Sequence, residues 1–384
     1  MKILYCYWTE YSVKDMIETL QNMGHSVHVI DIPHTDYNND SVFAAQMDKE
    51  ISNGKYDLVF TFDFFPIISA AAERGNIPYV SWIYDMPHST LSSPEIKNPC
   101  NNVFLFDYDF YKELEEKKHP CKLHHMPLAV NTARLDAMLG VYTGQTEYKY
   151  DVSFVGSLYE KCLYNQINYL PEYIKGYLEG VIAATQQIYG ANMVKELLKD
   201  DIIVELKKYV KLDIPEGYDT EYKDVFANLL NAKVTSEDRI RLLSYAAKLF
   251  KLSLWTGSEK DLIPDANYMG KVDYYSEMPK VFRQSKINLN ITLRSIKSGI
   301  PLRALDIMGA GGFLLSAYQP ELAELFTDGE DCVLFTSDED MLIKIEYYLN
   351  HDEERSQIAL NGYNKVKEYF SYEKLTGEIL TKVL

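Results

Sequence analysis

The sequence predicts an α/β protein with two Rossmann-like domains, the second of which carries a helical insertion. Short apolar runs rich in strand formers alternate with amphipathic helical patterns over residues 1–131, and the alternation resumes after residue 151. Strands joined by helices form parallel sheets, because a parallel pair needs a long crossover connection. Between about 160 and 250 the pattern is instead almost wholly helical.

The N-terminal domain is expected over residues 1–131. "KILYCYW" predicts a first strand, and "SVKDMIETLQNMGH" predicts a helix because Val13, Ile17 and Leu20 recur at helical spacing. Gly24 stands where a helix ends, and "SVHVIDI" predicts the second strand. Four more strands are predicted, alternating with helices, in "YDLVFTFDF", "IPYVSWIYD", "NVFLFD" and "CKLHHMPLAV". About six strands make a complete Rossmann-like sheet.

The C-terminal domain is expected over residues 151–368, after a linker at 132–150. The linker segment "YTGQTEYKY" is polar and is predicted to contribute nothing to a core. The strands of this domain are predicted in "DVSFVGS", "LSLWTGS", "ANYMGKV", "INLNIT", "GFLLSA" and "CVLF". Residues 369–384 are expected to form a last helix that packs back on the N-terminal domain.

Composition excludes several classes of partner. The 384 residues carry a net charge of -17, so the basic footprint of a nucleic-acid or anionic-lipid binder is missing. No apolar run approaches the roughly 20 residues that span a bilayer, and the N-terminus does not resemble a signal peptide. The five cysteines are scattered, which is typical of free thiols in a reducing compartment. A cytoplasmic protein without a membrane span is expected.

Two Rossmann-like domains on a short linker predict a cleft between the carboxyl edges of their sheets, where ligands bind in such folds. Four acid–base side chains follow predicted strands of the N-terminal half: Glu10, Asp63 in "TFDFFP", and Asp85 and His88 in "WIYDMPH". A group transfer to a hydroxyl needs a base within reach of it. Asp85 is the first candidate for a catalytic role, followed by the other three. Each acid could instead cap a helix or hold a turn.

The stretch "SGIPLRALDIMGAGGFLLSAYQ" predicts a helix with its N-terminus at the cleft. Pro301 suits the first turn of a helix, and the positive end of that helix suits a phosphate. Arg303 could bind the phosphate, and Asp306, one turn further, could reach ribose hydroxyls. The alternative is that Arg303 and Asp306 pair with each other at i, i+3.

Longer segments resemble a known family. "IPLRALDIMGAGGFLLSAYQPELAELFTDGEDCVLF" and "YYLNHDEERSQIALNGYNKV" resemble the C-terminal domain of group 1 glycosyltransferases, in particular the spore-maturation-protein-like branch. "FTFDFFPIISAAAERGNIPYVSWIYDMP" resembles a domain of unknown function that accompanies this module. The resemblance implies the GT-B fold and a metal-independent transfer of a hexose. The donor would be a nucleoside-diphosphate sugar, expected to be UDP-linked, that acts as co-substrate with no other cofactor.

The resemblance also implies roles for the acidic motif. Asp306 takes the place of the second acid of an E-x7-E motif, which binds the donor ribose. The first acid falls on Ser298.

Other donor contacts follow from the resemblance. Gly156 matches a glycine after the first C-terminal strand, but Ser157 stands where related enzymes carry an arginine on the diphosphate. Arg303 and Arg294 are the candidates to replace that arginine. In "YMGKVDYYSEMP" the base is expected to lie against a short loop, which nominates Gly270, Val272 and Tyr274.

The sequence therefore predicts a glycosyltransferase whose acceptor, a glycan, protein or small molecule, is unspecified. The insertion is a candidate for acceptor specificity or for contacts in a homodimer. Two rival hypotheses stay open, namely a nucleotide-sugar epimerase and a non-catalytic protein that binds a sugar nucleotide.

Overall fold

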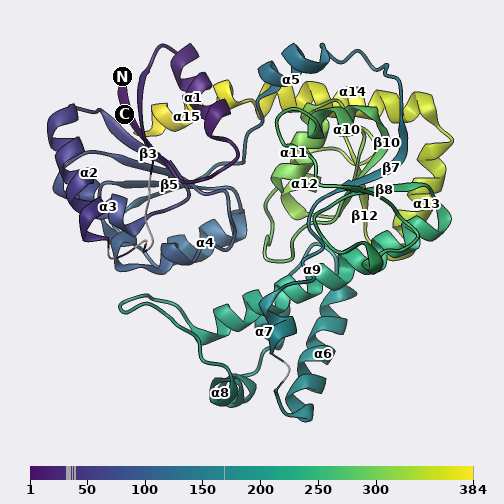
Figure 1. Ribbon diagram of the computed structural model, residues 1–384, viewed down its shortest axis with the longest axis horizontal. Helices are drawn as coiled ribbons and strands as arrows, with labels where there is room; N and C mark the ends of the chain where they lie inside the picture. Colours follow the sequence, from purple (N-terminus) through teal and green to yellow (C-terminus); the bar gives the residue numbers. More distant parts are fainter. Residues whose placement is uncertain (32–35, 37, 39, 168, 384) are drawn as a thin grey trace. The chain divides into compact units, whose positions relative to one another are not determined.

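The computed structural model describes residues 1–31, 36, 38, 40–167 and 169–383. The chain forms two compact units. Unit 1 comprises Met1–Ala129, Ile214–Thr220 and Tyr369–Leu384, and unit 2 comprises Val130–Asp213 and Glu221–Glu368. Each unit is built on one sheet of six strands (Figure 1), and every neighbouring pair is parallel. The prediction of two Rossmann-like domains is confirmed.

The sheet of unit 1 has the order β2-β1-β3-β4-β5-β6. Its strands are β1 (Lys2–Tyr7), β2 (Ser26–Asp31), β3 (Leu58–Phe62), β4 (Tyr79–Trp82), β5 (Asn101–Leu105) and β6 (Lys122–His125). Its helices are α1 (Val13–Asn22), α2 (Ser41–Gly54), α3 (Pro66–Arg74), α4 (Tyr108–Glu116) and α15 (Tyr372–Val383), with short 3-10 turns η1 (Ser89–Ser92) and η2 (Pro94–Lys97). The predicted second strand "SVHVIDI" extends to residue 32, which lies outside the described residues.

Helices cover both faces of this sheet. In Figure 1, α1 and α15 lie together on one face, and α2, α3 and α4 lie on the other. The strand β3 is buried along its whole length, as expected for a parallel strand covered on both faces. Apolar residues of α1 and α15, among them Met16, Leu20, Tyr372 and Ile379, complete the core on the α1 side.

A short segment from the middle of the chain also belongs to unit 1. Ile214–Thr220 lies against the loop that carries η1 and η2. The backbone N–H of Asp219 donates to the carbonyl of Ser92 (2.7 Å), and the Asp219 carboxylate pairs with Lys117 (2.9 Å). The insertion therefore contributes residues to both units.

The sheet of unit 2 has the order β12-β11-β10-β7-β8-β9. Its strands are β7 (Tyr150–Val155), β8 (Leu252–Trp255), β9 (Asn267–Gly270), β10 (Ser285–Asn290), β11 (Leu314–Ala317) and β12 (Val333–Phe335). Outside the insertion its helices are α5 (Thr132–Leu139), α10 (Met278–Gln284), α11 (Leu302–Gly309), α12 (Pro320–Leu325), α13 (Asp338–Leu349) and α14 (Asp352–Tyr369), with the 3-10 turn η4 (Lys260–Leu262). The chain runs outward from β7 to β9, then returns to β10 on the other side of β7. The strand order thus reverses between β7 and β10.

The insertion between β7 and β8 is helical, as predicted. It contains η3 (Leu163–Gln166), α6 (Glu172–Gln186), α7 (Val194–Leu197), α8 (Asp200–Tyr209) and α9 (Tyr222–Leu249). These helices bury a core of their own, to which Ile174, Leu198, Phe226 and Val234 contribute. The two helices predicted from "YKDVFANLLNA" and "SEDRIRLLSYAAKLF" form the single helix α9, whose far end packs on the sheet of unit 2 through Leu243.

The polar segment before β7 differs from the expectation. It contains the unpredicted helix α5, and Tyr142 is buried in the core of unit 2. Arg283 lies over the Tyr142 ring, 4.7 Å from its centroid. This mostly polar segment therefore contributes one aromatic side chain, Tyr142, to the core of unit 2. The expectation of a linker without core residues is wrong.

Two further properties concern the whole chain. The five cysteines are free. Among the described residues, none of the helices combines the length and the apolar character needed to cross a membrane.

The burial of α15 predicts that unit 1 depends on the end of the chain. Ile379 is fully buried in the core of unit 1. We expect Ile379→Ala to lower the free energy of unfolding by about 2–5 kcal/mol, because it removes buried methyl groups and leaves a cavity. Urea unfolding followed by tryptophan fluorescence measures this, since the Trp82 ring lies 6.1 Å from that of Tyr372. Lys374→Ala, at an exposed site of the same helix, is the control, and equal effects of both changes would contradict the prediction.

Candidate functional site

The predicted acid–base residues of unit 1 follow three neighbouring strands. Glu10 follows β1, Asp63 follows β3, and Asp85 and His88 follow β4. Because β3 lies between β1 and β4 in a parallel sheet, the three loops leave the same edge side by side. The sheet therefore brings the four residues to one place.

Asp63 anchors the loop that follows β4. Its side chain is fully buried, and Oδ1 accepts hydrogen bonds from the backbone N–H groups of Tyr84 (2.8 Å) and Asp85 (3.0 Å). Oδ2 has no hydrogen-bond partner among the described residues. Burial raises the pKa of this carboxyl, although His88 and the two N–H groups oppose the rise. Its φ of 58° lies in the left-handed region, which aspartate tolerates better than most residues.

Glu10 is a second buried carboxyl at this edge. Oε1 accepts from the Tyr5 hydroxyl (2.5 Å), and Oε2 accepts from the backbone N–H of Trp8 (3.0 Å). The Trp8 indole N–H donates to the carbonyl of Phe62 (2.9 Å), which fixes the Glu10 loop against the end of β3. Burial raises the pKa of Glu10, and the charge of Asp63 adds to the rise. Two adjacent carboxyls with raised pKa values are typical of a site that handles protons.

His88 and Asp85 complete the group. His88 Nε2 lies 3.1 Å from the carbonyl oxygen of Phe64, and a carbonyl only accepts, so this bond assigns the ring hydrogen to Nε2. Nδ1 lies 4.0 Å from Asp63 Oδ1. Asp85 is exposed, and within the described part of the chain its carboxylate has no hydrogen bond or ion pair. Of the three acids, Asp85 is the one that a substrate in solvent can reach.

In unit 2 the side chains of Tyr274, Arg303 and Asp306 converge. Asp306 in α11 is 6% exposed, and its Oδ2 accepts from Arg303 Nη1 (3.1 Å). The Tyr274 hydroxyl reaches the other oxygen of Asp306 at 3.4 Å. The i, i+3 pair that the sequence left as an alternative is thus present. It does not stand alone on a surface helix, because a side chain from the loop after β9 joins it.

Gly156 and Ser157, which follow β7, lie beneath an arginine that sequence reasoning missed. Arg239 of α9 donates from Nη1 to the carbonyl of Ser157 (2.7 Å), and from Nε and Nη2 to that of Ile291 (3.0 and 2.7 Å). A Cβ at position 156 would lie 3.6 Å from Arg239 Nη1, and 3.2 Å from the ring of Phe154. The tight contact is with the Phe154 ring, so glycine at the end of β7 leaves room for Phe154, while the distance to Arg239 is an ordinary van der Waals contact.

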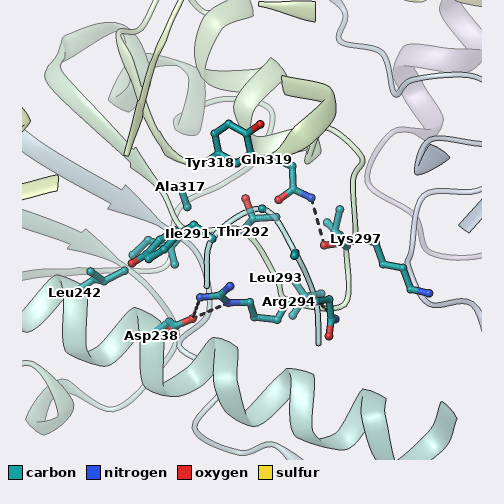
Figure 2. Close-up of a pocket in the computed structure, with 15 residues that line it drawn as sticks. Asp238, Leu242, Ile291, Thr292, Leu293, Arg294, Lys297, Ala317, Tyr318 and Gln319 are labelled. Atoms are coloured by element: carbon teal, nitrogen blue, oxygen red, sulfur yellow. Dashed lines mark hydrogen bonds and ion pairs between the residues drawn. The ribbon is translucent and has the colours of Figure 1, made fainter. Parts of the chain in front are cut away.

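Arg294 points to a different place. Its guanidinium binds the Asp238 carboxylate (2.7 and 2.8 Å; Figure 2) and donates to the carbonyl of Ile188 (2.6 Å). It lines a cavity of about 30 Å³ between α9 and the loop after β10, which is room for about one water molecule. An ion pair already engages this arginine, and its contacts hold α9 against the loop.

The other positions that the sequence predicted for donor binding also follow strands of the unit 2 sheet. Gly270 ends β9 with a φ of 79°, and Val272 is half-buried in the loop that leads to Tyr274. The Ser298 hydroxyl donates to Oε1 of Glu321 (2.7 Å), and both residues are buried. A carboxylate from α12 thus lies beside the position where the resemblance placed an acid. Among the described residues, no group of three histidine, cysteine or acidic side chains is arranged to hold a metal ion.

Comparison with known proteins adds one sequence match. A family model described as glycosyl transferase-like matches residues 235–381. This segment includes Arg239, Tyr274, Arg303 and Asp306. No curated protein matches the chain.

Solved structures show the same fold at low identity. The chain is similar to sucrose-phosphate synthase from Thermosynechococcus elongatus (TM-score 0.52, 11% identity, covering 100% of this chain and 99% of that one). It is also similar to a glycosyltransferase from Rickettsia africae ESF-5 (TM-score 0.53, 13% identity, covering 100% of this chain and 97% of that one). A third similar structure is Anabaena Alr3699/HepE in complex with UDP and glucose (TM-score 0.53, 10% identity, covering 100% of this chain and 99% of that one). With its two parallel six-stranded sheets, the chain has the GT-B fold.

Two residues at this edge escaped sequence reasoning for the same reason. Arg239 lies inside a long helical pattern without a motif, and Glu321 lies in a helix after the next strand. Arg239 follows no strand, and Glu321 comes soon after β11 but belongs to no motif. Their positions depend on packing between distant segments, which local patterns do not reveal.

The raised pKa of Asp63 predicts a pH effect on stability. Its unfolded value is near 3.8, and a carboxyl with a higher pKa in the folded state binds its proton more tightly there. Stability is then lost as pH rises from the unfolded pKa through the folded pKa. Asparagine offers an acceptor to the two N–H groups and does not ionise. We expect the free energy of unfolding of the wild type to fall relative to Asp63→Asn as the pH rises above 3.8.

Urea unfolding at a series of pH values measures this difference. Asp31→Asn, at an exposed carboxylate at the end of β2, is the matched control and should not reproduce it. A difference between wild type and Asp63→Asn that is constant with pH would show that the buried carboxyl has an ordinary pKa.

Proposed function

We propose that this protein is a glycosyltransferase that uses a nucleoside-diphosphate sugar as donor. The observation that carries the proposal is the buried Asp306 carboxylate, held by Tyr274 and Arg303 at the carboxyl edge of the second sheet. A carboxylate there can accept from two ribose hydroxyls, and a guanidinium can pair with phosphate. The glycosyl transferase-like match over residues 235–381 and the GT-B fold support the same assignment.

The finer assignment is a hexose donor linked to UDP. The structure of Anabaena Alr3699/HepE, which is similar in fold, is described as a complex with UDP and glucose. That likeness motivates UDP-glucose as the first donor to test. Several finer points remain predictions from the sequence. They are the acceptor, membership of the spore-maturation-protein-like branch, independence from metal, the cytoplasmic location and the formation of a homodimer.

The chemistry assigns different tasks to the two groups of residues. The acceptor hydroxyl must lose a proton, its oxygen must bond to the anomeric carbon, and the bond from that carbon to the diphosphate oxygen must break. The electron pair of the broken bond leaves on the nucleoside diphosphate, whose charge the arginines of unit 2 would stabilise. We assign proton removal to Asp85, because its carboxylate is exposed and has no hydrogen bond or ion pair among the residues that the structure describes. Asp63 acts as a positioning residue, since it binds the Tyr84 and Asp85 backbone.

The nucleotide site predicts a loss of affinity on truncation. We expect Asp306→Ala to weaken UDP binding about tenfold or more, because alanine accepts no hydrogen bond from ribose, and ~1.4 kcal/mol corresponds to one decade. Arg303→Ala should have a similar effect. Titration calorimetry on the folded variants measures both, with Asp265→Ala, an exposed acid of the same unit, as the control. Unchanged affinity in both variants would place the nucleotide elsewhere.

The base assignment predicts a loss of turnover without a loss of nucleotide affinity. We expect Asp85→Asn to lower the rate of UDP release from UDP-glucose by roughly 10²- to 10⁴-fold, the usual contribution of a general base. Its affinity for UDP should equal that of the wild type, because no unit 1 residue is assigned to the nucleotide. Release of UDP in the absence and presence of candidate acceptors is the assay. A variant with wild-type turnover would refute the role of Asp85, and an isomerised donor would favour an epimerase.

A further inference from the structure

The helical insertion delivers an arginine to the point where the strand order of the second sheet reverses. Arg239 binds the carbonyl of Ser157, just beyond β7, and the carbonyl of Ile291, just beyond β10. β7 and β10 are the two strands between which the order reverses. Ligands of open parallel sheets bind in the crevice outside the carboxyl ends of such strands. The guanidinium of Arg239 therefore bridges the two strand ends at which the topology of unit 2 places a ligand.

Among the described residues, no acid forms an ion pair with Arg239. Its hydrogen-bond partners are two carbonyls, and Phe154 and Tyr159 lie 5.4 and 5.1 Å away as aromatic neighbours. Within the described part of the chain, no carboxylate oxygen lies within 4.0 Å of it. Arg241 and Arg294, by contrast, both pair with Asp238. A half-buried cation without an acidic partner is unusual, because removing a charge from water is costly unless it is paired.

A second guanidinium acts on the same place. Burial, with a smaller contribution from the charge of Arg303, lowers the pKa of Arg239 to about 10, while Tyr159 and Asp238 oppose the shift. Arg303 shares its charge with one carboxylate, Asp306. With the neighbouring ion pairs included, four guanidiniums (Arg239, Arg241, Arg294 and Arg303) stand against three carboxylates (Asp238, Asp306 and Asp338). These groups therefore leave one positive charge, although the whole chain carries a net charge of -17. A bound anion would balance that local charge.

Arg239 also keeps donors for such an anion. A guanidinium has five N–H groups in a fixed fork. Three donate to the two carbonyls, so two remain. The part of α9 that carries Arg239 is held in position, because Arg294 binds Asp238, its neighbour in the helix (Figure 2). The backbone N–H of Arg294 also donates to the Thr235 hydroxyl of the same helix (2.9 Å). A fixed fork with free N–H groups suits the oxygens of a phosphate.

We infer that Arg239, together with Arg303, binds the diphosphate of the donor, so that the helical insertion forms part of the donor site. This inference rests on the proposed function, because it assigns one contact of the nucleotide. It gives the insertion a role in donor binding, in addition to the acceptor or dimer role considered from the sequence. The chemical class of the ligand is a diphosphate ester, with inorganic pyrophosphate as its smallest soluble analogue.

The test compares ligands with and without the diphosphate. UDP, uridine and inorganic pyrophosphate are titrated into the wild type, Arg239→Ala and Arg239→Lys by calorimetry. We expect Arg239→Ala to weaken UDP about tenfold or more and to leave uridine unchanged, because only the phosphate contact is removed. Lysine should restore part of the loss, since it keeps the charge but not the fork. Lys248→Ala, which removes an exposed charge from the same helix, should bind UDP like the wild type.

The outcomes separate the two proposals. If the wild type binds UDP but Arg239→Ala binds it equally well, or loses uridine as strongly as UDP, the role of Arg239 is refuted and the proposed function stands. If the wild type binds none of UDP, GDP and ADP, the proposed function fails and this inference fails with it. Should Arg239→Ala not fold, displacement of UDP by pyrophosphate in Arg239→Lys decides the question. Several-fold weaker displacement than in the wild type supports the inference, and equal displacement refutes it.

Discussion

Parallel strands that are buried on both faces force charged groups to the ends of the strands, and both units follow this constraint. Along β3 no charged side chain is tolerated, so Asp63 appears only after Phe62. At such an edge the backbone groups lose their strand partners and must find others. In unit 1 a carboxylate accepts from the N–H groups of Tyr84 and Asp85. In unit 2 the guanidinium of Arg239 donates to backbone carbonyls. The same backbone requirement is met by opposite charges.

The sign of the charge determines what each edge can do. A buried carboxyl can take up a proton, and the raised pKa values of Glu10 and Asp63 reflect that response to burial. An arginine keeps its proton at neutral pH, so a half-buried guanidinium has to be balanced by an anion or by dipoles. The first edge is therefore suited to proton transfer and the second to the binding of negative groups.

The sequence predicts the strands and the residues that follow them, because both depend on local patterns. Asp63, Asp85 and His88 could be placed together, since each comes directly after a predicted strand of one sheet. The same reasoning nominated Arg294 and missed Arg239. Arg294 follows a strand, but it is paired with Asp238 from a distant helix. Arg239 follows no strand, and only the packing of α9 brings it to the edge. Tyr142 was missed for a related reason, since a single aromatic residue anchors an otherwise polar segment.

The continuity of α9 explains how an inserted element can supply a precise contact. The first half of the helix, including Phe226 and Val234, belongs to the core of the insertion. The second half, including Leu243, belongs to the core of the second sheet. Arg239 lies between these halves, so two separately packed cores fix the backbone that carries it. An arginine on a free loop would lose backbone and side-chain freedom on binding an anion, and that loss would reduce its affinity. On α9 most of this freedom is already lost when the chain folds.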